Sequence, residues 1–158
     1  MRRILAAGLL AFTVTGCSSG GSGYVSRSNH TCAETRKTIG QLKPPADPKA
    51  GLAYALDRYV AVEKAVSTLT DSSLPGGPTG RDLRDRWLRP ARASLKTGNA
   101  DLKQLRDAAR DGDRSAASSA FTAASAAGTA GVDTDLLRAR SLTTCAELFT
   151  PSTPAVDW

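Results

Sequence analysis

Apolar residues recur every three or four positions along most of this chain, and this helical spacing limits the possible folds more than any other feature. The clearest stripe consists of Leu52, Leu56, Tyr59, Val62, Val66 and Leu69. Such spacing places apolar side chains on one face of an amphipathic helix. The predicted opposite face carries Asp57, Arg58, Lys64 and Ser67. No stretch alternates apolar and polar residues over the length of a strand, so the sequence predicts an all-α protein.

Proline, glycine and capping residues divide the chain into helices. We expect helices over residues 31–43, 48–69, 79–111, 114–127 and 134–149. Asp47, Asp113 and Asp133 are typical N-caps, and Gly112 suits the left-handed residue that follows a helix. Short connections between amphipathic helices favour a single-domain bundle of four to five helices. The bundle is predicted over residues 30–150, followed by a loose C-terminal tail over 151–158 that ends in Trp158. The alternatives for Trp158 are docking back on the bundle and a contact with a partner.

The third predicted helix contains two residues that disfavour helices, Pro90 and Gly98. Its apolar stripe keeps its phase across both, which favours one long element. Pro90 removes the hydrogen bond to the carbonyl of Arg86, so we expect a kink there. A break at Gly98-Asn99 into two helices is the main alternative. Gly98 lies on the apolar stripe, where it would also allow a neighbouring backbone to approach closely.

The N-terminus has the pattern of a bacterial lipoprotein signal. Arg2 and Arg3 are followed by an apolar run from Ile4 to Val14, which suits the hydrophobic region of a signal peptide. Val14-Thr15-Gly16-Cys17 then resembles a lipobox, in which the cysteine thiol carries the lipid and becomes the mature N-terminus. An ordinary secretory signal is the alternative. We therefore predict a signal peptide over 1–16 and a lipid-anchored, flexible Ser/Gly-rich tether over 17–29.

The same features suggest a class of protein. The lipobox, the Ser/Gly tether, the Ala/Arg/Asp-rich helices and the segment 144–149 together resemble small secreted proteins and putative lipoproteins of high-GC Gram-positive bacteria, notably actinomycetes. The resemblance implies a location at the extracytoplasmic face of the cell membrane. It implies one functional residue, Cys17, as the site of acylation. Secretion without an anchor is the alternative location.

The three cysteines separate into an anchor and a pair. If Cys17 is acylated, Cys32 and Cys145 are the only cysteines left. An extracytoplasmic compartment permits a disulfide between them, and that bond would link the first helix to the last. Two buried free thiols, or a cysteine-based active site, are the alternatives. The only histidine, His30, lies two residues from Cys32, where the two side chains would diverge on a helix.

The composition argues against several kinds of site. One histidine and three cysteines exclude a multi-histidine or four-cysteine metal site. The aspartates at 107, 111 and 113 lack the spacing of a calcium loop. Neither a nucleophile elbow nor a phosphate-binding loop is present. We therefore predict no catalytic residue, no metal and no cofactor, and a protein that is not an enzyme. The net charge of +6 falls by two when Arg2 and Arg3 are removed, and a location outside the cell argues against nucleic acid as a partner.

An arginine-rich stretch is the strongest charged feature of the predicted domain. Arg81, Arg84 and Arg92 fall within an arc of about 80° on a helical wheel. Arginines bind phosphate and carboxylate groups in bidentate fashion, so these three are a candidate anion site. A solvated face with local pairs, such as Asp82 with Arg86, is the alternative.

From these features we expect a lipid-anchored protein with a non-catalytic binding or scaffolding role at the cell envelope. Its expected partners are the membrane, through the lipid on Cys17, and an envelope protein or an anionic polymer. One alternative function is binding of anionic lipid or cell-wall polymer through the cluster between Arg81 and Arg92. An enzyme of unknown type is the other alternative, because the sequence does not show which carboxylates converge.

Overall fold

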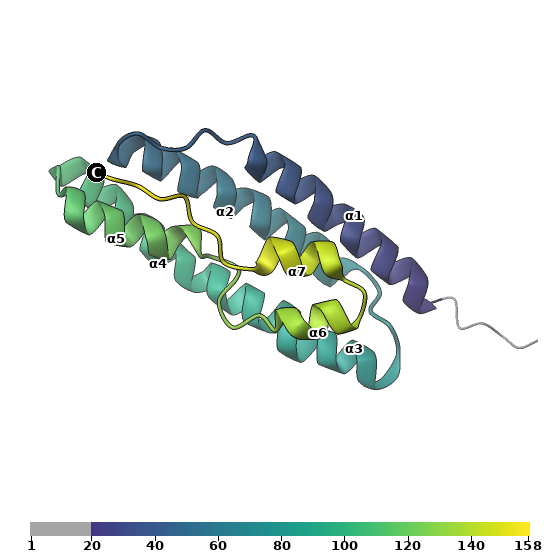
Figure 1. Cartoon of the computed structure of the whole chain (residues 1–158). Helices are drawn as coiled ribbons and strands as arrows, with labels where there is room; N and C mark the ends of the chain where they lie inside the picture. Colours follow the sequence, from purple (N-terminus) through teal and green to yellow (C-terminus); the bar gives the residue numbers. More distant parts are fainter. Residues whose placement is uncertain (1–19) are drawn as a thin grey trace, which may run out of the picture.

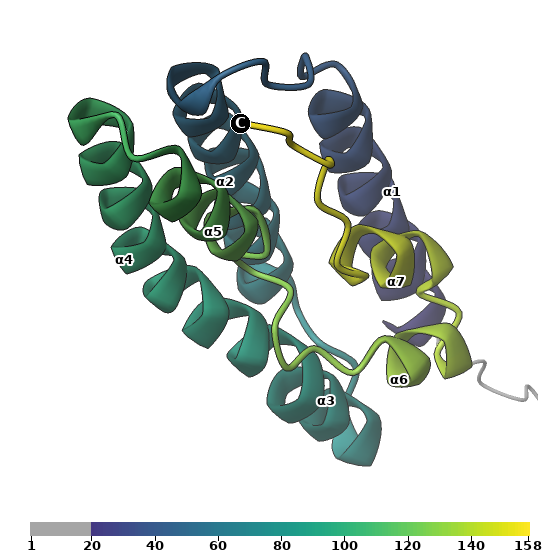
Figure 2. The ribbon, with the colours of Figure 1, turned by 60° about the vertical axis from the view of Figure 1, so that its left-hand side comes forward.

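The computed structural model describes residues 20–158, and its regular structure is helical. The long helices are α1 (Gly20–Gly40), α2 (Pro48–Asp71), α4 (Arg89–Asp111) and α5 (Arg114–Ser125), and the short ones are α3 (Gly77–Leu83), α6 (Thr134–Ala139) and α7 (Thr143–Phe149). The helices α2, α4 and α5 pack together, while α1 lies along α2 with α7 against it (Figures 1 and 2). The prediction of an all-α bundle is confirmed.

Capping residues set several helix ends as predicted. Asp47 accepts a hydrogen bond from the amide of Ala50 at 2.8 Å at the start of α2. Asp113 caps α5 through the amide of Ala116. Gly112 ends α4 with a φ of 75°, a left-handed conformation that costs glycine little because it has no Cβ. These ends depend on neighbours within four residues, which is why the local sequence predicts them.

The helix that contains Pro90 continues through it. Arg84–Leu88 form a π-helical turn between α3 and α4, in which the amide of Arg89 donates to the carbonyl five residues back. Proline has no amide hydrogen, so it leaves the carbonyl of Arg86 without its helical partner. The amide of Asp133 donates to that carbonyl at 3.0 Å, and the Arg86 guanidinium bonds the Asp133 carboxylate. The predicted long element is therefore continuous, and another segment of the chain satisfies the freed carbonyl.

Gly98 allows α4 and the end of α5 to pack closely. A Cβ built at Gly98 would lie 2.4 Å from the Cβ of Ala127 and 3.4 Å from its Cα. Gly98 is itself buried within α4, which runs unbroken across it. The alternative of a helix break at Gly98-Asn99 is therefore wrong, and the close approach of a neighbouring backbone is confirmed.

The first helix begins earlier than predicted. Residues 20–29, which we assigned to a flexible tether, form the first half of α1. Tyr24 and Ser28 are buried in the bundle. The assignment fails because it used local composition, whereas packing of these side chains stabilises the helix despite its glycines and serines. The predicted signal peptide, 1–16, and the lipidation site Cys17 lie outside the described residues.

The last predicted helix is two helices. Ser141 has a φ of 60° between α6 and α7, which breaks the helix predicted over 134–149. The amide of Leu142 donates to the carbonyl of Leu137 at 2.8 Å, a bond typical of a helix C-terminus. Asn29 of α1 donates its side-chain N–H to the carbonyl of Ser141 at 2.8 Å. A contact from a distant part of the sequence thus holds the turn.

A disulfide joins the two ends of the bundle. Cys32 of α1 and Cys145 of α7 are bonded, with their Cα atoms 5.1 Å apart and a sequence separation of 113. Both residues are fully buried. The predicted link between the first and last helices is confirmed.

The C-terminal tail packs on the bundle. It runs from α7 back toward the start of α2 (Figures 1 and 2). The ring of Trp158 meets that of Phe121 edge-on, with centroids 5.5 Å apart. A Cβ at Gly51 would lie 2.7 Å from the Trp158 ring, so only glycine leaves room for it there. The prediction of a loose tail is wrong for Trp158, because its ring covers apolar surface that α2 and α5 leave open.

Candidate binding grooves beside the second helix

Two surface grooves lie on either side of a ridge on α2. The groove between α2 and α4 has a volume of about 700 Å³, and the groove between α1 and α2 has one of about 680 Å³. Val60, Lys64 and Thr68 line both grooves. These residues are four apart, so they form a row along one face of the helix. Leu56 lies four residues before Val60 and extends the row, although it lines only the groove between α1 and α2. We call the row of Leu56, Val60, Lys64 and Thr68 the α2 ridge.

The α2 ridge carries apolar side chains that the bundle does not bury. Leu56 is 48% exposed and Val60 is 53% exposed, and these two are the large apolar side chains most open to solvent in the described part of the chain. The prediction that Leu56 is buried is wrong. The buried face of α2 includes the small residues Gly51 and Ala55, and Gly51 leaves room for the rings of Phe121 and Trp158. With this face of α2 turned toward the bundle, Leu56 lies on the solvent side.

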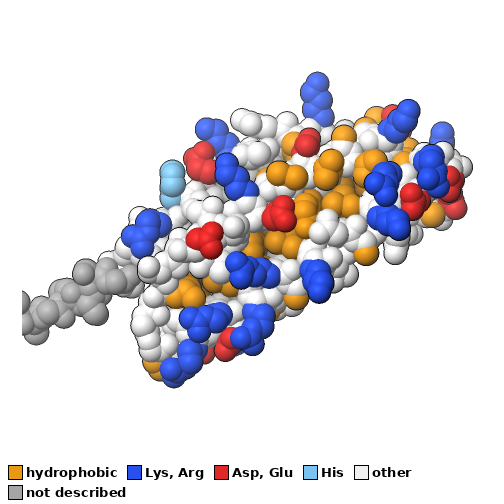
Figure 3. Space-filling view, turned by 180° about the vertical axis from the view of Figure 1, so that it is seen from behind, with side chains coloured by type: hydrophobic (Ala, Val, Ile, Leu, Met, Phe, Trp, Pro, Cys, Tyr) orange, Lys and Arg blue, Asp and Glu red, His pale blue; other side chains and the backbone are white. Residues whose placement is uncertain are grey.

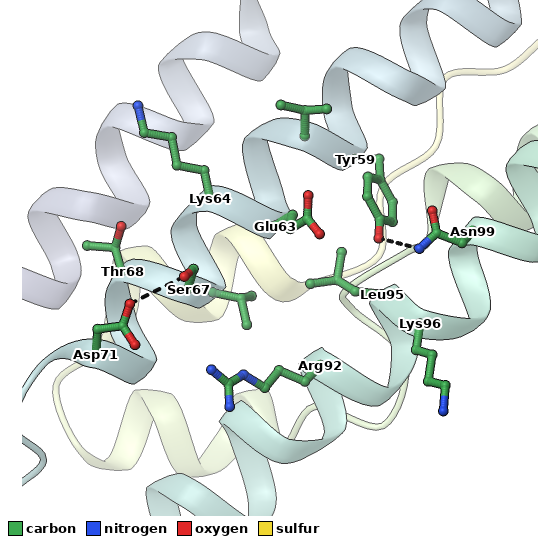
Figure 4. Close-up of a pocket in the computed structure, with 12 residues that line it drawn as sticks. Tyr59, Glu63, Lys64, Ser67, Thr68, Asp71, Arg92, Leu95, Lys96 and Asn99 are labelled. Atoms are coloured by element: carbon green, nitrogen blue, oxygen red, sulfur yellow. Dashed lines mark hydrogen bonds between the residues drawn. The ribbon is translucent and has the colours of Figure 1, made fainter.

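The groove between α2 and α4 is polar (Figure 4). Its charged side chains are Glu63, Lys64, Asp71, Arg92 and Lys96. Within residues 20–158, none of the three cations comes within 4.0 Å of a carboxylate. Both signs of charge are therefore available to a ligand or partner.

Tyr59 and Asn99 form a fixed hydrogen-bonding pair at the wall of this groove. The side-chain N–H of Asn99 donates to the Tyr59 hydroxyl oxygen at 2.9 Å. Burial raises the pKa of Tyr59 above its ordinary value and Glu63 raises it further, while the bond from Asn99 partly offsets both. The phenol is therefore protonated at neutral pH, and its own hydrogen can be donated to a ligand.

The groove between α1 and α2 is more apolar. Leu42, Leu56, Val60, Ala61 and Ala65 contribute to its surface, and His30 lies among its lining residues. Two threonines of α1 in this groove use their hydroxyls within the helix: Thr35 donates to the carbonyl of Thr31 and Thr38 to that of Glu34. Figure 3, seen from behind, shows apolar side chains gathered in the middle of this side of the molecule.

The structure brings two of the three predicted anion-binding arginines together. Arg84 and Arg92 line one cavity of about 480 Å³, together with Arg89. The other lining residues are Thr70, Ser72, Leu74, Pro75 and Leu88. Arg81 is exposed but is not among the residues that line this cavity. Arg92 also lines the polar groove, so the arginine cavity and the polar groove adjoin.

The local ion pair that we considered for this stretch is replaced by longer-range pairs. Asp82 accepts from Arg140 at 3.2 Å, and Arg86 pairs with Asp133, so Asp82 and Arg86 do not bond each other. Arg89 pairs with Asp85 at 3.1 Å, four residues apart, as a local pair should. The π-helical turn over 84–88 changes which residues share a face, and sequence spacing alone does not reveal that turn.

Arg58 is buried, although its charge led us to place it on the outer face of α2. It is 3% exposed, and its Nη1 atom has no hydrogen-bond partner among the described residues. Burial lowers the pKa of Arg58 below its ordinary value, while Tyr54 acts in the opposite direction. Gly51, Ala55 and Arg58 are four and three positions apart and share this face, and the two small residues are the sequence signal that the prediction missed.

Two features are absent from the described residues, a membrane-spanning helix and a cluster of metal ligands. No helix within residues 20–158 is long and apolar enough to span a membrane. The same residues contain no cluster of three or more His, Cys, Asp or Glu side chains placed to hold a metal ion. Comparisons with protein families, with curated proteins and with solved structures find no match to this chain.

Proposed function

We propose that this protein is a lipid-anchored, extracytoplasmic binding protein of the cell envelope that uses the α2 ridge and its two grooves to hold a partner. One observation carries the proposal. Leu56 and Val60 are about half exposed on a ridge that stands between two grooves of about 700 and 680 Å³. Large apolar side chains on a hollowed surface, rimmed by charges, are typical of sites for another protein.

The location rests on the lipobox and is consistent with the disulfide. Val14-Thr15-Gly16-Cys17 has the residue types that lipoprotein processing requires. Disulfides persist mainly in oxidising compartments, and the Cys32–Cys145 bond agrees with such a compartment. The proposed partners are therefore the membrane, through the lipid, and a second protein of the envelope.

A binding role without catalysis suits the groups that the grooves present. The polar groove offers cations, carboxylates and the Tyr59 hydroxyl, all of which make ordinary polar contacts to a protein surface. The adjoining groove offers an apolar floor. A helix or an extended segment with apolar side chains on one face and charges at its edges would fit both.

A crosslinking experiment tests the binding surface. A photoreactive residue in place of Lys64, on the α2 ridge, should capture a defined envelope partner in cells. The same residue in a chain with Leu56→Glu and Val60→Glu should lose that product, because two buried charges would oppose docking. A photoreactive residue in place of Ser115, exposed in the first turn of α5, is the control. Equal capture from position 64 in both chains would contradict the proposal.

The anchor is tested separately by mass spectrometry. The mature chain should begin at Cys17 and carry the mass of a diacylglycerol and an acyl group. Cys17→Ser should release the protein from the membrane fraction. An unmodified Cys17 in membrane-bound material would contradict the anchor and leave the binding surface to be judged by crosslinking.

A second candidate function rests on the arginine cavity. Arg84 and Arg92 line it together with Arg89, which also pairs with Asp85, and guanidinium groups gathered in this way suit a phosphate group of a cell-wall polymer. Binding of the Cys17→Ser chain to isolated phosphate-rich wall polymer should weaken with salt and with Arg84→Gln/Arg92→Gln. Binding that this double substitution leaves unchanged would remove the candidate.

A further inference from the structure

The position of α1 limits how far the bundle can stand from a lipid on Cys17. Only Ser18 and Ser19 separate Cys17 from Gly20, where α1 begins. An extended chain covers at most about 3.6 Å per residue, so the first residue of α1 lies within about 11 Å of the modified cysteine. The predicted tether of thirteen residues would have allowed any orientation, but this short connection does not. The end of the bundle where α1 begins must stay close to the bilayer.

That end of the bundle is built from three distant segments of the sequence. A cavity of about 420 Å³ there is lined by the first turns of α1, the connection into α3, α3 itself and the turn after α6. Its lining residues are Gly21, Tyr24, Val25, Pro75, Gly76, Thr79, Leu83, Arg140 and Leu142. In Figures 1 and 2 the start of α1 and α3 lie at one end of the molecule, and the turn between α4 and α5 lies at the other. We call the first of these the α1-start end.

The α1-start end carries arginines that its carboxylates do not neutralise. Arg27 and Arg81 are exposed, and neither has a carboxylate within 4.0 Å in the part of the chain that the structure describes. The Nη1 atom of Arg27 reaches back to within 3.2 Å of where a Gly23 Cβ would stand, toward the start of α1. The nearby carboxylate of Asp82 is already paired with Arg140. Between Gly20 and Ala33, α1 contains no acidic residue.

The opposite end carries both unpaired and paired cations, and Lys103 and Arg114 there have no carboxylate within 4.0 Å among the described residues. There, Arg106 and Arg110 lie among Asp107 and Asp111, and each of the two arginines contacts a carboxylate. Figure 3 shows Lys and Arg side chains at both ends of the molecule, with acidic side chains among them at each end. What distinguishes Arg27 and Arg81 is their position, because these unpaired arginines lie at the end that the short connection holds near the lipid.

We infer that the α1-start end is a membrane-facing surface, on which Arg27 and Arg81 contact the headgroups of anionic phospholipids. The inference rests on the proposed lipidation of Cys17 and deepens it. The anchor supplies the attachment, and the arginines supply the orientation: α1 points away from the bilayer, and the α4–α5 turn faces outward. The α2 ridge, which runs along the side of the bundle, stays open to a partner in the envelope.

Charge and proximity together favour a bilayer as the occupant of this surface. A basic residue near an anionic bilayer contributes about fivefold to partitioning, and the effect decays within a Debye length of roughly 10 Å at moderate salt. The limit of about 11 Å set by the chain places the start of α1 within that range. A phosphate-bearing wall polymer would not require the basic groups to lie beside the anchor.

Vesicle binding tests the headgroup contact. The Cys17→Ser chain and vesicles with 30% phosphatidylglycerol in phosphatidylcholine provide the assay. Arg27→Gln/Arg81→Gln should lower the partition coefficient about 25-fold. The matched control is Lys103→Gln/Arg114→Gln, which removes the same charge from exposed positions near the other end. Equal losses in the two doubles, or no loss in the first, would overturn the inference. All four substituted positions are exposed, and thermal melts should confirm that both chains remain folded.

Orientation is measured on the lipidated full chain in the same vesicles. A fluorescent residue in place of Thr79 should be quenched by a headgroup-linked quencher, whereas one in place of Ser115 should not. Similar quenching at both sites would overturn the inference while leaving the anchor intact. The mass of Cys17 is determined on the same preparation, and an unmodified Cys17 would overturn both the anchor and the orientation. Tighter binding to wall polymer than to vesicles, lost in the Arg27/Arg81 double, would also overturn it in favour of a polymer surface.

Discussion

Loss of the Cys32–Cys145 disulfide should cost this bundle a large part of its stability. The bond joins α1 to α7 across 113 positions, so in the unfolded chain it closes a loop that includes nearly the whole domain. The chain-entropy relation assigns a loop of this length about 4.8 kcal/mol at 25 °C. A small domain has a total stability of about 5–15 kcal/mol. The reduced protein should therefore be marginally stable.

Reduction is the cleanest perturbation because it keeps both sulfur atoms in place. In a chain with Cys17→Ser, only this pair can react. Urea unfolding followed by circular dichroism should give a free energy of unfolding about 3–5 kcal/mol lower with reductant than without it. Unfolding entropy near 2.1 cal/mol/K per residue over residues 20–158 converts a loss of 4.8 kcal/mol into a fall in Tm of about 15 °C.

The slope of the urea transition gives an independent check. A crosslinked unfolded chain exposes less surface, so the m value should rise on reduction. Cys32→Ala/Cys145→Ala should lose at least as much stability as reduction, because both side chains are fully buried and their removal also affects packing. A difference below about 1 kcal/mol between oxidised and reduced protein, with an unchanged m value, would refute the loop-entropy reasoning.

Three further predictions follow from particular contacts. Gly98→Val should lower the free energy of unfolding by about 1–3 kcal/mol, because its Cβ would meet Ala127 at 2.4 Å in a packed core; chemical denaturation measures it. Trp158→Ala should lower the free energy of unfolding by at least about 0.5–1.5 kcal/mol through loss of the aromatic contact with Phe121. Tryptophan fluorescence of the native protein should report the burial of Trp158. The amide of Leu136 chiefly, and Arg86 less strongly, lower the pKa of Asp133, with desolvation opposing them. The ionised carboxylate therefore stabilises the fold at pH values above the ordinary pKa of aspartate, and this stabilisation is lost as the pH falls through the lowered pKa. Asp133→Asn should consequently show a smaller fall in the free energy of unfolding between about pH 5 and pH 2.

Each of these has a control or a contrary outcome. Ala100→Val, at an exposed position of α4, lowers helix propensity, whereas Gly98→Val raises it, so the control should cost no more than about 0.7 kcal/mol through propensity alone; an equal loss at both positions would deny the close contact at residue 98. Asp157→Ala is the control for Trp158→Ala. Asp157 is exposed beside the tryptophan in the sequence, so its substitution should leave the free energy of unfolding unchanged. Parallel pH profiles of the native protein and Asp133→Asn would contradict the role of that carboxylate.

Local signals predicted the features that local physics decides. The N-caps Asp47, Asp113 and Asp133 and the left-handed Gly112 form as expected, because each acts on neighbours within one helical turn. The small side chain of Gly98 on an apolar stripe predicted close packing, which the contact with Ala127 confirms.

The errors share a different origin, in contacts between distant segments. Residues 20–29 are helical because Tyr24 and Ser28 pack into the bundle, although their composition is typical of a tether. Arg58 is buried and Leu56 exposed because the close approach of Phe121 and Trp158 decides which face of α2 turns inward. Helical spacing identifies a periodic face, but the shape of the neighbours selects among faces of similar character.

The sequence by itself determined an all-α bundle, most of its helix ends and the disulfide that joins the first helix to the last, because periodicity, caps and the pairing of two remaining cysteines are readable along one chain. Only the tertiary structure decided the α2 ridge, the meeting of Arg84 with Arg92 in one cavity, the docking of Trp158 and the length of chain left between Cys17 and α1. Each of these depends on how segments far apart in the sequence share space, and no local pattern encodes that arrangement.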